Sequence, residues 1–480
     1  MRQLTGLDSS FLRMETPTTY GHVASLAIFD PSTAPHPVGY HEIRALIESR
    51  LHLVPPFRRR LVEVPLGIDH PYWIEDPDFD LDFHLRHIAV PPPGDRGQLA
   101  ELSVRIAARH LDRSRPLWEM YIIEGLEGGY IAQLTKIHHS CIDGVAGAEI
   151  LGVLLDVEPE PAPTPPPTTP WQWEREPSSR EMFARGMLGA MTQPRVGMRL
   201  ARQTVPALGT IMRNFALKAP GVTKRDDVLS RPSVQAPRTA FNGVITPHRR
   251  FAFGSLPISS VKAVKNALGG TVNDVVMALC AGALRRWLID HDSLPDLPLL
   301  AMVPVSVRDD SEQSAGGNRV SAMVAVLPTD EPDPRRRLEA MQGEMAIAKQ
   351  EHGALPASLL QDFAQFTPPS VLGTASRVAA RARLMDRVSL PFNVVISNVP
   401  GPQFPLYTGG ARMEGIYPIS TILDGVGLNM TLMSYNGKLD FGLVADRDMV
   451  PDIWLLMDYL GDELEILEKL AAIESPTSAD

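Results

Sequence analysis

The sequence predicts an α/β protein of two domains, on three observations. Its 480 residues exceed what a single hydrophobic core usually organises. Its hydrophobic share of 44% and charged share of 21% are ordinary for a globular protein with sizeable cores. Residues 157–179 (VEPEPAPTPPPTTPWQWEREPSS) hold too many prolines for a helix or a central strand, so we expect an extended linker between two halves.

In the first half, strand patterns alternate with helix patterns. Residues 81–90 (LDFHLRHIAV) begin with the apolar–polar alternation of a half-buried strand. We also expect strands at 121–123 and 130–139, and helices at 99–111 and 145–155.

The second half shows the same mixture. We expect a strong helix at 271–290 and strands at 299–307, 322–327 and 392–397. The segments 428–434 and 439–444 flank Asn436-Gly437, a dipeptide typical of tight turns, and therefore predict a β-hairpin.

Charge and cysteine content limit the classes of function. A net charge of −10 argues against nucleic acid as a general partner. The two cysteines, Cys141 and Cys280, cannot form a disulfide framework, which fits a reducing, cytoplasmic setting. The N-terminus lacks the apolar core of a signal peptide, and no apolar run reaches the length of a membrane span, so we expect a soluble or peripheral protein.

One segment of this acidic chain is basic. Residues 182–225 contain no acidic residue. Eight basic residues lie among its methionines, leucines and phenylalanines: Arg185, Arg195, Arg199, Arg202, Arg213, Lys218, Lys224 and Arg225. Two interpretations stay open, an amphipathic stretch on an anionic membrane surface or a helix pair that bridges the domains. Pro194 and Pro206 exclude one long helix.

The motif HHSCIDG carries the chemistry. On a strand, His138 and His139 would point to opposite faces and could not chelate one metal, so we expect one working and one supporting histidine. Asp143 either orients a neighbouring group or caps the helix that follows, and Gly144 allows close backbone approach. Cys141 is interpreted as a packing residue rather than as a nucleophile.

These residues resemble the HHxxxDG motif of the CoA-dependent acyltransferase superfamily, which includes chloramphenicol acetyltransferase-like enzymes and condensation domains. The rest of the chain resembles one branch, the bacterial wax ester synthase/diacylglycerol acyltransferases. The segments that carry this resemblance are LTGLDSSFLRMETPTTYGHVASL (4–26), VPPFRRRL (54–61), DFDLDFHLRH (78–87), PLWEMYIIEGL (116–126), APRTAFNG (236–243), TVNDVVMALCAGALRRWL (271–288), VPVSVR (303–308) and SNVPGP (397–402). The chain has no DFGWG motif, and the most similar segment is LDFGLVAD (439–446). The absence of DFGWG argues against the acetyltransferase branch.

The resemblance implies a fold and a division of the chain. The fold is α/β, with two chloramphenicol acetyltransferase-like domains of mixed sheets flanked by helices and a substrate tunnel between them. We expect an N-terminal acyltransferase domain at 1–158, a proline-rich linker with basic crossover helices at 159–235, and a C-terminal acyltransferase domain at 236–480.

The resemblance also implies a reaction, the transfer of a long-chain acyl group from acyl-CoA to diacylglycerol or to a long-chain alcohol. His139 would be the general base, with His138 and Asp143 as structural support. Asn273 is a candidate oxyanion stabiliser; its alternative role is a helix N-cap, with Asp274 in the first turn. Gly144 and Asp274 are assigned to substrate binding. No metal or cofactor is expected, because acyl-CoA is a substrate.

Two other functions remain as alternatives. One is a condensation-like acyltransferase that uses carrier-protein thioesters, and the other is a non-catalytic protein that binds lipid surfaces. The expected location is cytoplasmic, with peripheral association to membrane or lipid inclusions. The oligomeric state stays open.

Overall fold

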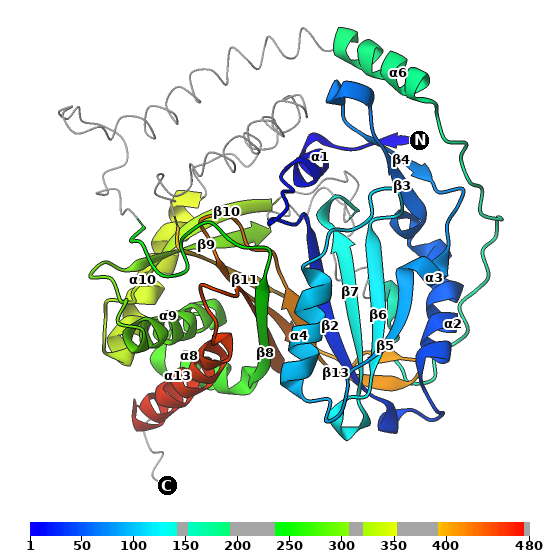
Figure 1. Ribbon diagram of the computed structural model, residues 1–480. Helices are drawn as coiled ribbons and strands as arrows, with labels where there is room; N and C mark the ends of the chain where they lie inside the picture. Colours follow the sequence, from blue (N-terminus) through cyan, green and yellow to red (C-terminus); the bar gives the residue numbers. More distant parts are fainter. Residues whose placement is uncertain (142–151, 193–235, 307–319, 353–391, 475–480) are drawn as a thin grey trace.

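The computed structural model describes residues 1–141, 152–192, 236–306, 320–352 and 392–474. Two lobes lie side by side, one built mainly from the first half of the chain and one from the second (Figure 1). Each lobe contains a mixed β-sheet with helices against it. The sequence-based expectation of an α/β fold in two similar parts is therefore confirmed.

The first lobe is organised around a sheet of strand order β12-β13-β2-β7-β6-β5. Its strands are β2 (His22–Asp30), β5 (Leu85–Ala89), β6 (Trp118–Glu124), β7 (Ile131–His138), β12 (Tyr407–Thr408) and β13 (Ala411–Ile419). Strand β7 lies between β2 and β6, and every residue of β7 is buried. The histidine pair therefore stands at the end of a fully buried strand in the centre of this sheet.

Smaller elements surround this sheet. A second sheet has the order β1-β4-β3. The bounds are β1 (Arg2–Gln3), β3 (Arg59–Val62), β4 (Tyr72–Glu75), α1 (Gly6–Arg13), α2 (Tyr40–Arg50), α3 (Leu81–His84), α4 (Arg96–Ala107) and α6 (Ser179–Thr192). Helix α4 begins at a capping box in which Asp95 accepts the Gln98 backbone N–H and the Gln98 side chain reaches back to the Asp95 N–H.

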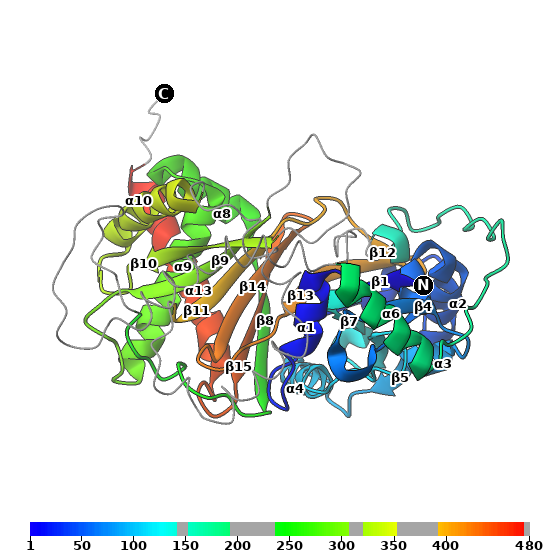
Figure 2. The same cartoon turned by 90° about the horizontal axis from the view of Figure 1, so that it is seen from above.

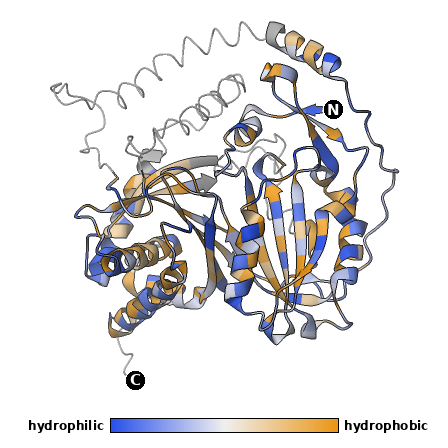
Figure 3. Cartoon of the chain, viewed as in Figure 1, coloured by the Kyte–Doolittle hydropathy of each residue, from blue (hydrophilic) through white to orange (hydrophobic). Residues whose placement is uncertain are grey.

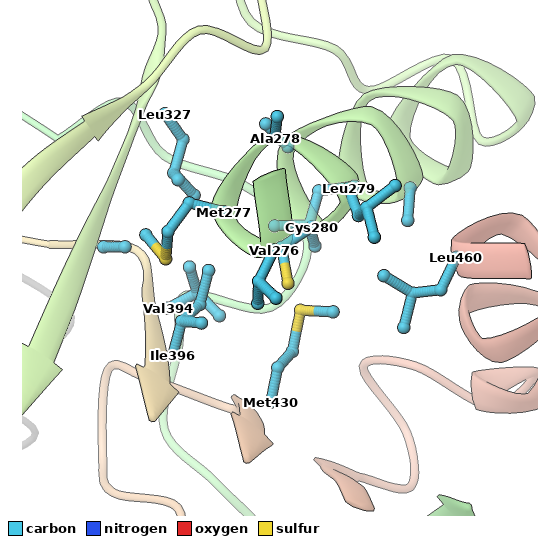
Figure 4. Packing of buried hydrophobic residues seen from close by; sticks show 14 of the residues in the cluster. Val276, Met277, Ala278, Leu279, Cys280, Leu327, Val394, Ile396, Met430 and Leu460 are labelled. Carbon is cyan, nitrogen blue, oxygen red and sulfur yellow. The ribbon is translucent and has the colours of Figure 1, made fainter. Parts of the chain in front are cut away.

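The second lobe has a sheet of order β10-β9-β11-β14-β15-β8, covered by α8, α9, α10 and α13. The bounds are β8 (Arg249–Pro257), β9 (Leu299–Ser306), β10 (Val320–Leu327), β11 (Val394–Val399), β14 (Leu428–Tyr435), β15 (Lys438–Asp446), α8 (Ile258–Leu268), α9 (Val272–Asp290), α10 (Pro334–His352) and α13 (Ile453–Glu474). Helix α9 is the centre of the core: Val276, Met277 and Cys280 pack towards Val394, Ile396 and Met430 of the sheet (Figure 4).

Strand β13 ties the lobes together. It belongs to the second half of the chain but pairs antiparallel with β2 of the first lobe, from Arg412↔Asp30 to Ile419↔Ala24. Figure 2 shows β13 between the two lobes. From the other side, α4 of the first lobe packs on β8 of the second. The second half of the chain thus contributes β12 and β13 to the sheet of the first lobe, and α4 of the first lobe packs on the second; these contacts set the relative placement of the lobes.

Most of the expected elements are found. The helix at 271–290, the strands of the second half and the hairpin at Asn436-Gly437 are present, and both turn residues have the positive φ that such a turn requires. The expectation for 81–90 is wrong in its first half, because Leu81–His84 form a helical turn capped by the Asp80 side chain before β5 begins. The helix expected at 145–155 lies largely outside the described residues.

The proline-rich stretch runs without helix or strand from residue 157 to 178, as expected, and then enters α6. Within the described ranges, no single helix is both long and apolar enough to cross a membrane. Along strands of both lobes, hydrophobic and hydrophilic colours interchange (Figure 3). Apolar residues of these strands belong to the buried hydrophobic clusters.

Candidate active site

The histidine pair stands where β7 ends. Strand β7 closes at His138, and His139 begins a short 3-10 turn, η6 (His139–Cys141). The expected strand thus ends one residue early, so strand alternation does not apply to the pair. The surroundings of the two rings still differ: His138 is buried among polar groups, whereas His139 is half-buried and stacks on an aromatic ring. The two histidines therefore have different environments.

His138 is enclosed on both sides of its ring. The Ser140 backbone N–H donates to Nδ1 over 3.1 Å, and the Ser140 hydroxyl lies 2.7 Å from the same nitrogen. On the other side, Nε2 lies 3.4 Å from the carboxylate Oε1 of Glu15. Burial lowers the pKa of His138 in spite of that carboxylate, so the ring is neutral at pH 7.

His139 is held by its backbone and by one flat contact. Its N–H donates to the Gly21 carbonyl over 3.0 Å, and its ring stacks on Phe11 of α1 with centroids 4.8 Å apart. Burial, with a smaller contribution from His138, lowers the pKa of His139 to about 4. The imidazole is thus neutral at physiological pH, which is the protonation state that can accept a proton.

The N-terminal segment supplies three residues that motif reasoning missed: Phe11, Glu15 and Gly21. Gly21 faces the ring of His138 so closely that a Cβ atom there would lie 2.5 Å from Nε2. Residues 4–26 were quoted above only as a resemblance, and nothing in their chemistry singled out these three. Their role depends on α1 packing against η6, a contact between segments about 130 residues apart.

A second layer supports the sheet behind the pair. His22 is the register partner of His138 on β2, and its Nε2 lies 2.6 Å from the Ala107 carbonyl. Lys136, fully buried on β7, donates to the carbonyls of Ile106 and Arg109. Both side chains thus bond to carbonyls at the C-terminal end of α4, where the helix dipole favours positive charge. Burial lowers the pKa of Lys136 to about 8.

A small cavity opens between the lobes beside His22. Tyr20, His22 and Ala107 line it from the first lobe, and Arg249 and Thr421 line it from the second. Arg249 lies over the Tyr20 ring at 5.2 Å, and the Thr421 hydroxyl donates to the Tyr20 carbonyl over 3.1 Å. Apolar side chains, among them Val104, Ile419 and Val444, make up the rest of the lining, so Arg249 and Thr421 place a few polar groups in a mainly apolar cavity.

Asn273 occupies the first turn of α9 in the other lobe. The alternative role of Asn273 as the helix N-cap is wrong, because Thr271 is the N-cap. The Thr271 hydroxyl accepts the Asp274 N–H over 3.2 Å, and Asp274 Oδ2 accepts the Thr271 N–H over 2.8 Å. Asp274 is buried in the first turn, as expected. The Asn273 amide oxygen instead accepts the side-chain N–H of Asn398 over 3.3 Å. The structure therefore joins two of the quoted segments, TVND and SNVPGP.

The structure brings some of the candidate residues together and leaves others apart. His138 and His139 meet the N-terminal segment, and Asn273 meets Asn398. In the described part of the chain, no hydrogen bond joins Asn273 to either histidine. Asp143 and Gly144 lie outside the described residues. Cys141 is buried and burial raises the pKa of its thiol to about 12, which agrees with a packing residue.

Two other quoted segments have structural roles. Trp118, in the PLW segment, is buried between the rings of Phe57 and His84, and its indole N–H donates to the Phe57 carbonyl over 2.9 Å. In APRTAFNG, the Asn242 side chain donates to the carbonyls of Asn393 and Gly425 over 2.9 and 2.8 Å, which anchors the chain as it enters β11. Neither segment contributes a described side chain to the histidine pair.

Comparison with known proteins covers almost the whole chain. Residues 4–276 match the family model of the wax ester synthase/diacylglycerol acyltransferase catalytic domain, and residues 316–468 match that of the WS/DGAT C-terminal domain. A Mycobacterium tuberculosis protein provisionally named a diacylglycerol O-acyltransferase is 38% identical over 98% of this chain and 90% of its own. The O-acyltransferase WSD of Acinetobacter baylyi is 35% identical over 98% of both chains.

Solved structures agree with this result. The wax ester synthase/diacylglycerol acyltransferase of Marinobacter aquaeolei superposes with a TM-score of 0.68 at 33% identity, covering 98% of this chain and 100% of its own. The first condensation domain of the calcium-dependent antibiotic synthetase shares the fold alone, with a TM-score of 0.52 at 14% identity over 98% and 97% of the two chains.

Proposed function

The chain belongs to the wax ester synthase/diacylglycerol acyltransferase family, and from this we propose that His139 is the general base of acyl transfer from acyl-CoA to diacylglycerol or a long-chain alcohol. The observation that carries the proposal is the neutral imidazole of His139, half-buried at the end of β7 and fixed by Phe11 and the Gly21 carbonyl. The other histidine is less accessible: its side chain is buried, Ser140 occupies Nδ1, and Nε2 lies 3.4 Å from the Glu15 carboxylate.

The reaction needs one proton to move twice. The His139 imidazole takes the proton of the acceptor hydroxyl, and the oxygen attacks the thioester carbonyl carbon. The resulting tetrahedral oxyanion collapses, the carbon–sulfur bond breaks, and the imidazolium returns the proton to the leaving thiolate. The products are an ester and CoA thiol, and the enzyme ends in its starting protonation state. A low pKa at His139 favours the second transfer, because the imidazolium gives up its proton readily.

Asn273 is proposed as the donor that stabilises the oxyanion. Thr271 performs the capping, so the Asn273 amide is not used by the helix. Because its oxygen is occupied by Asn398, its NH₂ group is the part left to face a substrate. Removal of one such donor costs about 10²–10³-fold in turnover in other acyl-transfer enzymes.

The test is acyl transfer from palmitoyl-CoA to diacylglycerol and to hexadecanol, with wild type and His139→Ala in parallel. We expect both esters from the wild type, more triacylglycerol than wax ester, and a loss of about 10²–10⁴-fold in the variant, the usual contribution of a general base. His22→Ala serves as a folding control at a buried neighbouring histidine. Equal turnover by His139→Ala and wild type would refute the assignment of the base. Turnover of carrier-protein thioesters but not acyl-CoA would favour the condensation-like alternative.

We also propose that the enzyme works at a lipid surface, where its acceptor and its product partition. Helix α6 packs Met182 and Gly186 onto the β3–β4 hairpin around Val64 and Ile68, yet its outer face exposes Phe183 and Met187. Beside it, at the tip of that hairpin, Leu66 is 80% exposed and holds a positive φ of 61°. An apolar outer face and a strained, exposed leucine are typical of a surface that is covered in use.

Vesicle flotation tests this surface. We expect the wild type to float with vesicles of phosphatidylglycerol and diacylglycerol, and the double variant Leu66→Ser/Met187→Ser to remain largely unbound. Leu297→Ser is the control, a leucine on the second lobe whose exposure of 54% lies between that of Met187 and that of Leu66. The acid-free sequence 182–225 adds an electrostatic part, so high salt should weaken binding. Wild type that stays unbound at low salt would refute the proposal.

A further inference from the structure

Glu15 is the most heavily engaged carboxylate near the histidine pair. Its Oε1 accepts the Gly21 backbone N–H over 2.9 Å, and its Oε2 accepts the Arg113 guanidinium over 2.6 Å. His110 Nδ1 lies 3.7 Å and His138 Nε2 lies 3.4 Å from Oε1. Only 9% of the side chain is exposed, so four groups from three separate segments meet on one nearly buried carboxylate.

The hydrogen bonds around His138 define its tautomer. A backbone N–H can only donate, so the Ser140 N–H makes Nδ1 an acceptor and leaves the ring proton on Nε2. The Nε2 atom then lies 3.4 Å from Oε1 of Glu15, which is an electrostatic contact and not a hydrogen bond among the described residues. Glu15 therefore stabilises the same His138 tautomer that the Ser140 N–H requires. The turn that carries His139 depends on the hydrogen bond between Ser140 and this tautomer.

Glu15 also acts on His139 through the backbone. It accepts the N–H of Gly21, and the carbonyl of the same residue accepts the N–H of His139 over 3.0 Å. The chain Glu15–Gly21–His139 thus fixes the point from which the His139 side chain projects onto Phe11. A displacement of about 1 Å in a reacting group can cost about 10²-fold in rate, so this anchoring has a kinetic consequence.

We propose that Glu15 is a positioning residue for acyl transfer, which holds His138 as the Nε2–H tautomer and fixes the backbone of His139 through Gly21. This inference rests on the proposed role of His139 as the base. Glu15 touches no reacting atom, so its contribution is to kcat through geometry and not to substrate binding.

The charge of Glu15 is constant over the working pH range. Burial acts to raise the pKa of Glu15, but its contacts with His110, His138 and Arg113 outweigh burial and lower the pKa well below its usual range. The charged and titratable groups that face it are Arg113, His110 and His138 directly, with His22 and Lys136 at longer range. A carboxylate that stays ionised can position a ring without adding a titration of its own to the pH profile.

The variant Glu15→Gln tests the proposal, because it keeps the size and the acceptor for Gly21 but places an amide where the charge was. We expect kcat to fall about 10²-fold with KM for acyl-CoA within about twofold. Glu63→Gln is the matched control: Glu63 also contacts Arg113, at 3.8 Å, and pairs with Arg13 at 2.9 Å, and none of its ion pairs among the described residues is with a histidine. It should retain wild-type kcat.

A second readout is independent of activity. Nitrogen-15 NMR of histidine-labelled protein should show His138 protonated at Nε2 in the wild type, in Glu63→Gln and in Glu15→Asp, but in a mixture of tautomers in Glu15→Gln. The signal is assigned by its absence in His138→Gln. Glu15→Asp, which keeps the charge, should restore most of kcat.

Two results would overturn the inference: wild-type kcat in Glu15→Gln, or an unchanged tautomer in a Glu15→Gln protein that has lost activity. Failure of the proposed function appears elsewhere, as an active His139→Ala, and leaves the tautomer measurement unaffected.

Discussion

The two candidate groups of the reaction are held in opposite ways. The histidine pair ends a buried strand and is surrounded by a segment from the chain's beginning, with contacts from Phe11, Glu15, Gly21 and Ser140. Asn273 stands on the first turn of a helix whose buried residues form an apolar core, and among the described residues its side chain makes one hydrogen bond, of 3.3 Å, with Asn398.

This difference follows from what each group must do. A base must approach the acceptor hydroxyl at a defined distance and in a defined protonation state, so both the backbone and the tautomer need several constraints. An oxyanion donor needs only to lie where the charge develops, and a rigid helix start provides that position with few polar contacts. Changes around the histidines should therefore reduce turnover more than changes around Asn273.

The largest effect is expected from one methyl group at Gly21. In Gly21→Ala the new Cβ would lie 2.5 Å from His138 Nε2 and 2.8 Å from the Phe11 carbonyl, so the ring or the loop must move. We expect a loss of about 10²-fold or more in kcat, because the same residue anchors the His139 backbone. Steady-state acyl transfer at saturating palmitoyl-CoA measures it.

Gly461→Ala is the matched control, since a Cβ on that residue of α13 meets nothing within 4 Å. It should keep full activity and raise stability by about 0.5–1 kcal/mol, as alanine does in place of glycine within a helix. A Gly21→Ala protein with wild-type turnover would show that the close approach at His138 is dispensable.

The next effect is expected at the asparagine pair. Asn273→Ala should reduce kcat by about 10²-fold as an oxyanion donor is lost, and Asn398→Ala by about tenfold as the amide loses its orientation. The double variant should be no worse than Asn273→Ala, because Asn398 acts only through its partner. Losses that multiply in the double variant would mean that Asn398 contacts the substrate itself.

The pH profile separates the base from an ordinary histidine. Burial lowers the pKa of His139 from 6.5 to about 4, so its neutral, active form persists as the pH falls from 7 to about 5. Activity should fall tenfold per pH unit only below about pH 4, provided that the protein remains folded. The same shift costs stability as the pH falls from 6.5 to 4, because the unfolded histidine binds a proton and the folded one does not.

Measurement of kcat/KM from pH 4 to 8, with circular dichroism at each pH, tests this prediction. An inflection near pH 6.5 in the folded protein would place the base in a solvated environment and weaken the contrast drawn between the two regions.

Local patterns in the sequence predicted local structure well. The hairpin follows from Asn436-Gly437, and α9 follows from a long apolar pattern after Thr271. The crossover of β13 into the first sheet was not predictable in this way. Its partner β2 lies about 390 residues earlier, and a strand pattern does not indicate which strand it will pair with. Expectations for membrane association, the tunnel, Asp143 and Gly144 stay predictions.

The residues of the candidate site also differ in whether the sequence alone could identify them. Adjacent histidines are conspicuous in a sequence, and their strand alternation indicated that their roles differ. Glu15 carries no such signal: one glutamate among 56 acidic residues becomes notable only when α1 folds onto η6. A polar residue that acts through a contact with a distant segment can be identified only from the structure. A residue that acts within its own motif can be identified from the sequence.

The smallest effect is expected at the start of α9. Thr271→Ala removes the hydroxyl that accepts the Asp274 N–H, which should lower the free energy of unfolding by about 1 kcal/mol. Because the core around Val276 and Leu279 holds the rest of the helix in place, kcat should change less than threefold. Chemical denaturation measures the stability loss, and acyl transfer measures kcat. A tenfold loss of kcat at unchanged stability would mean that the cap orients Asn273, and the second region would then be as strongly constrained as the first.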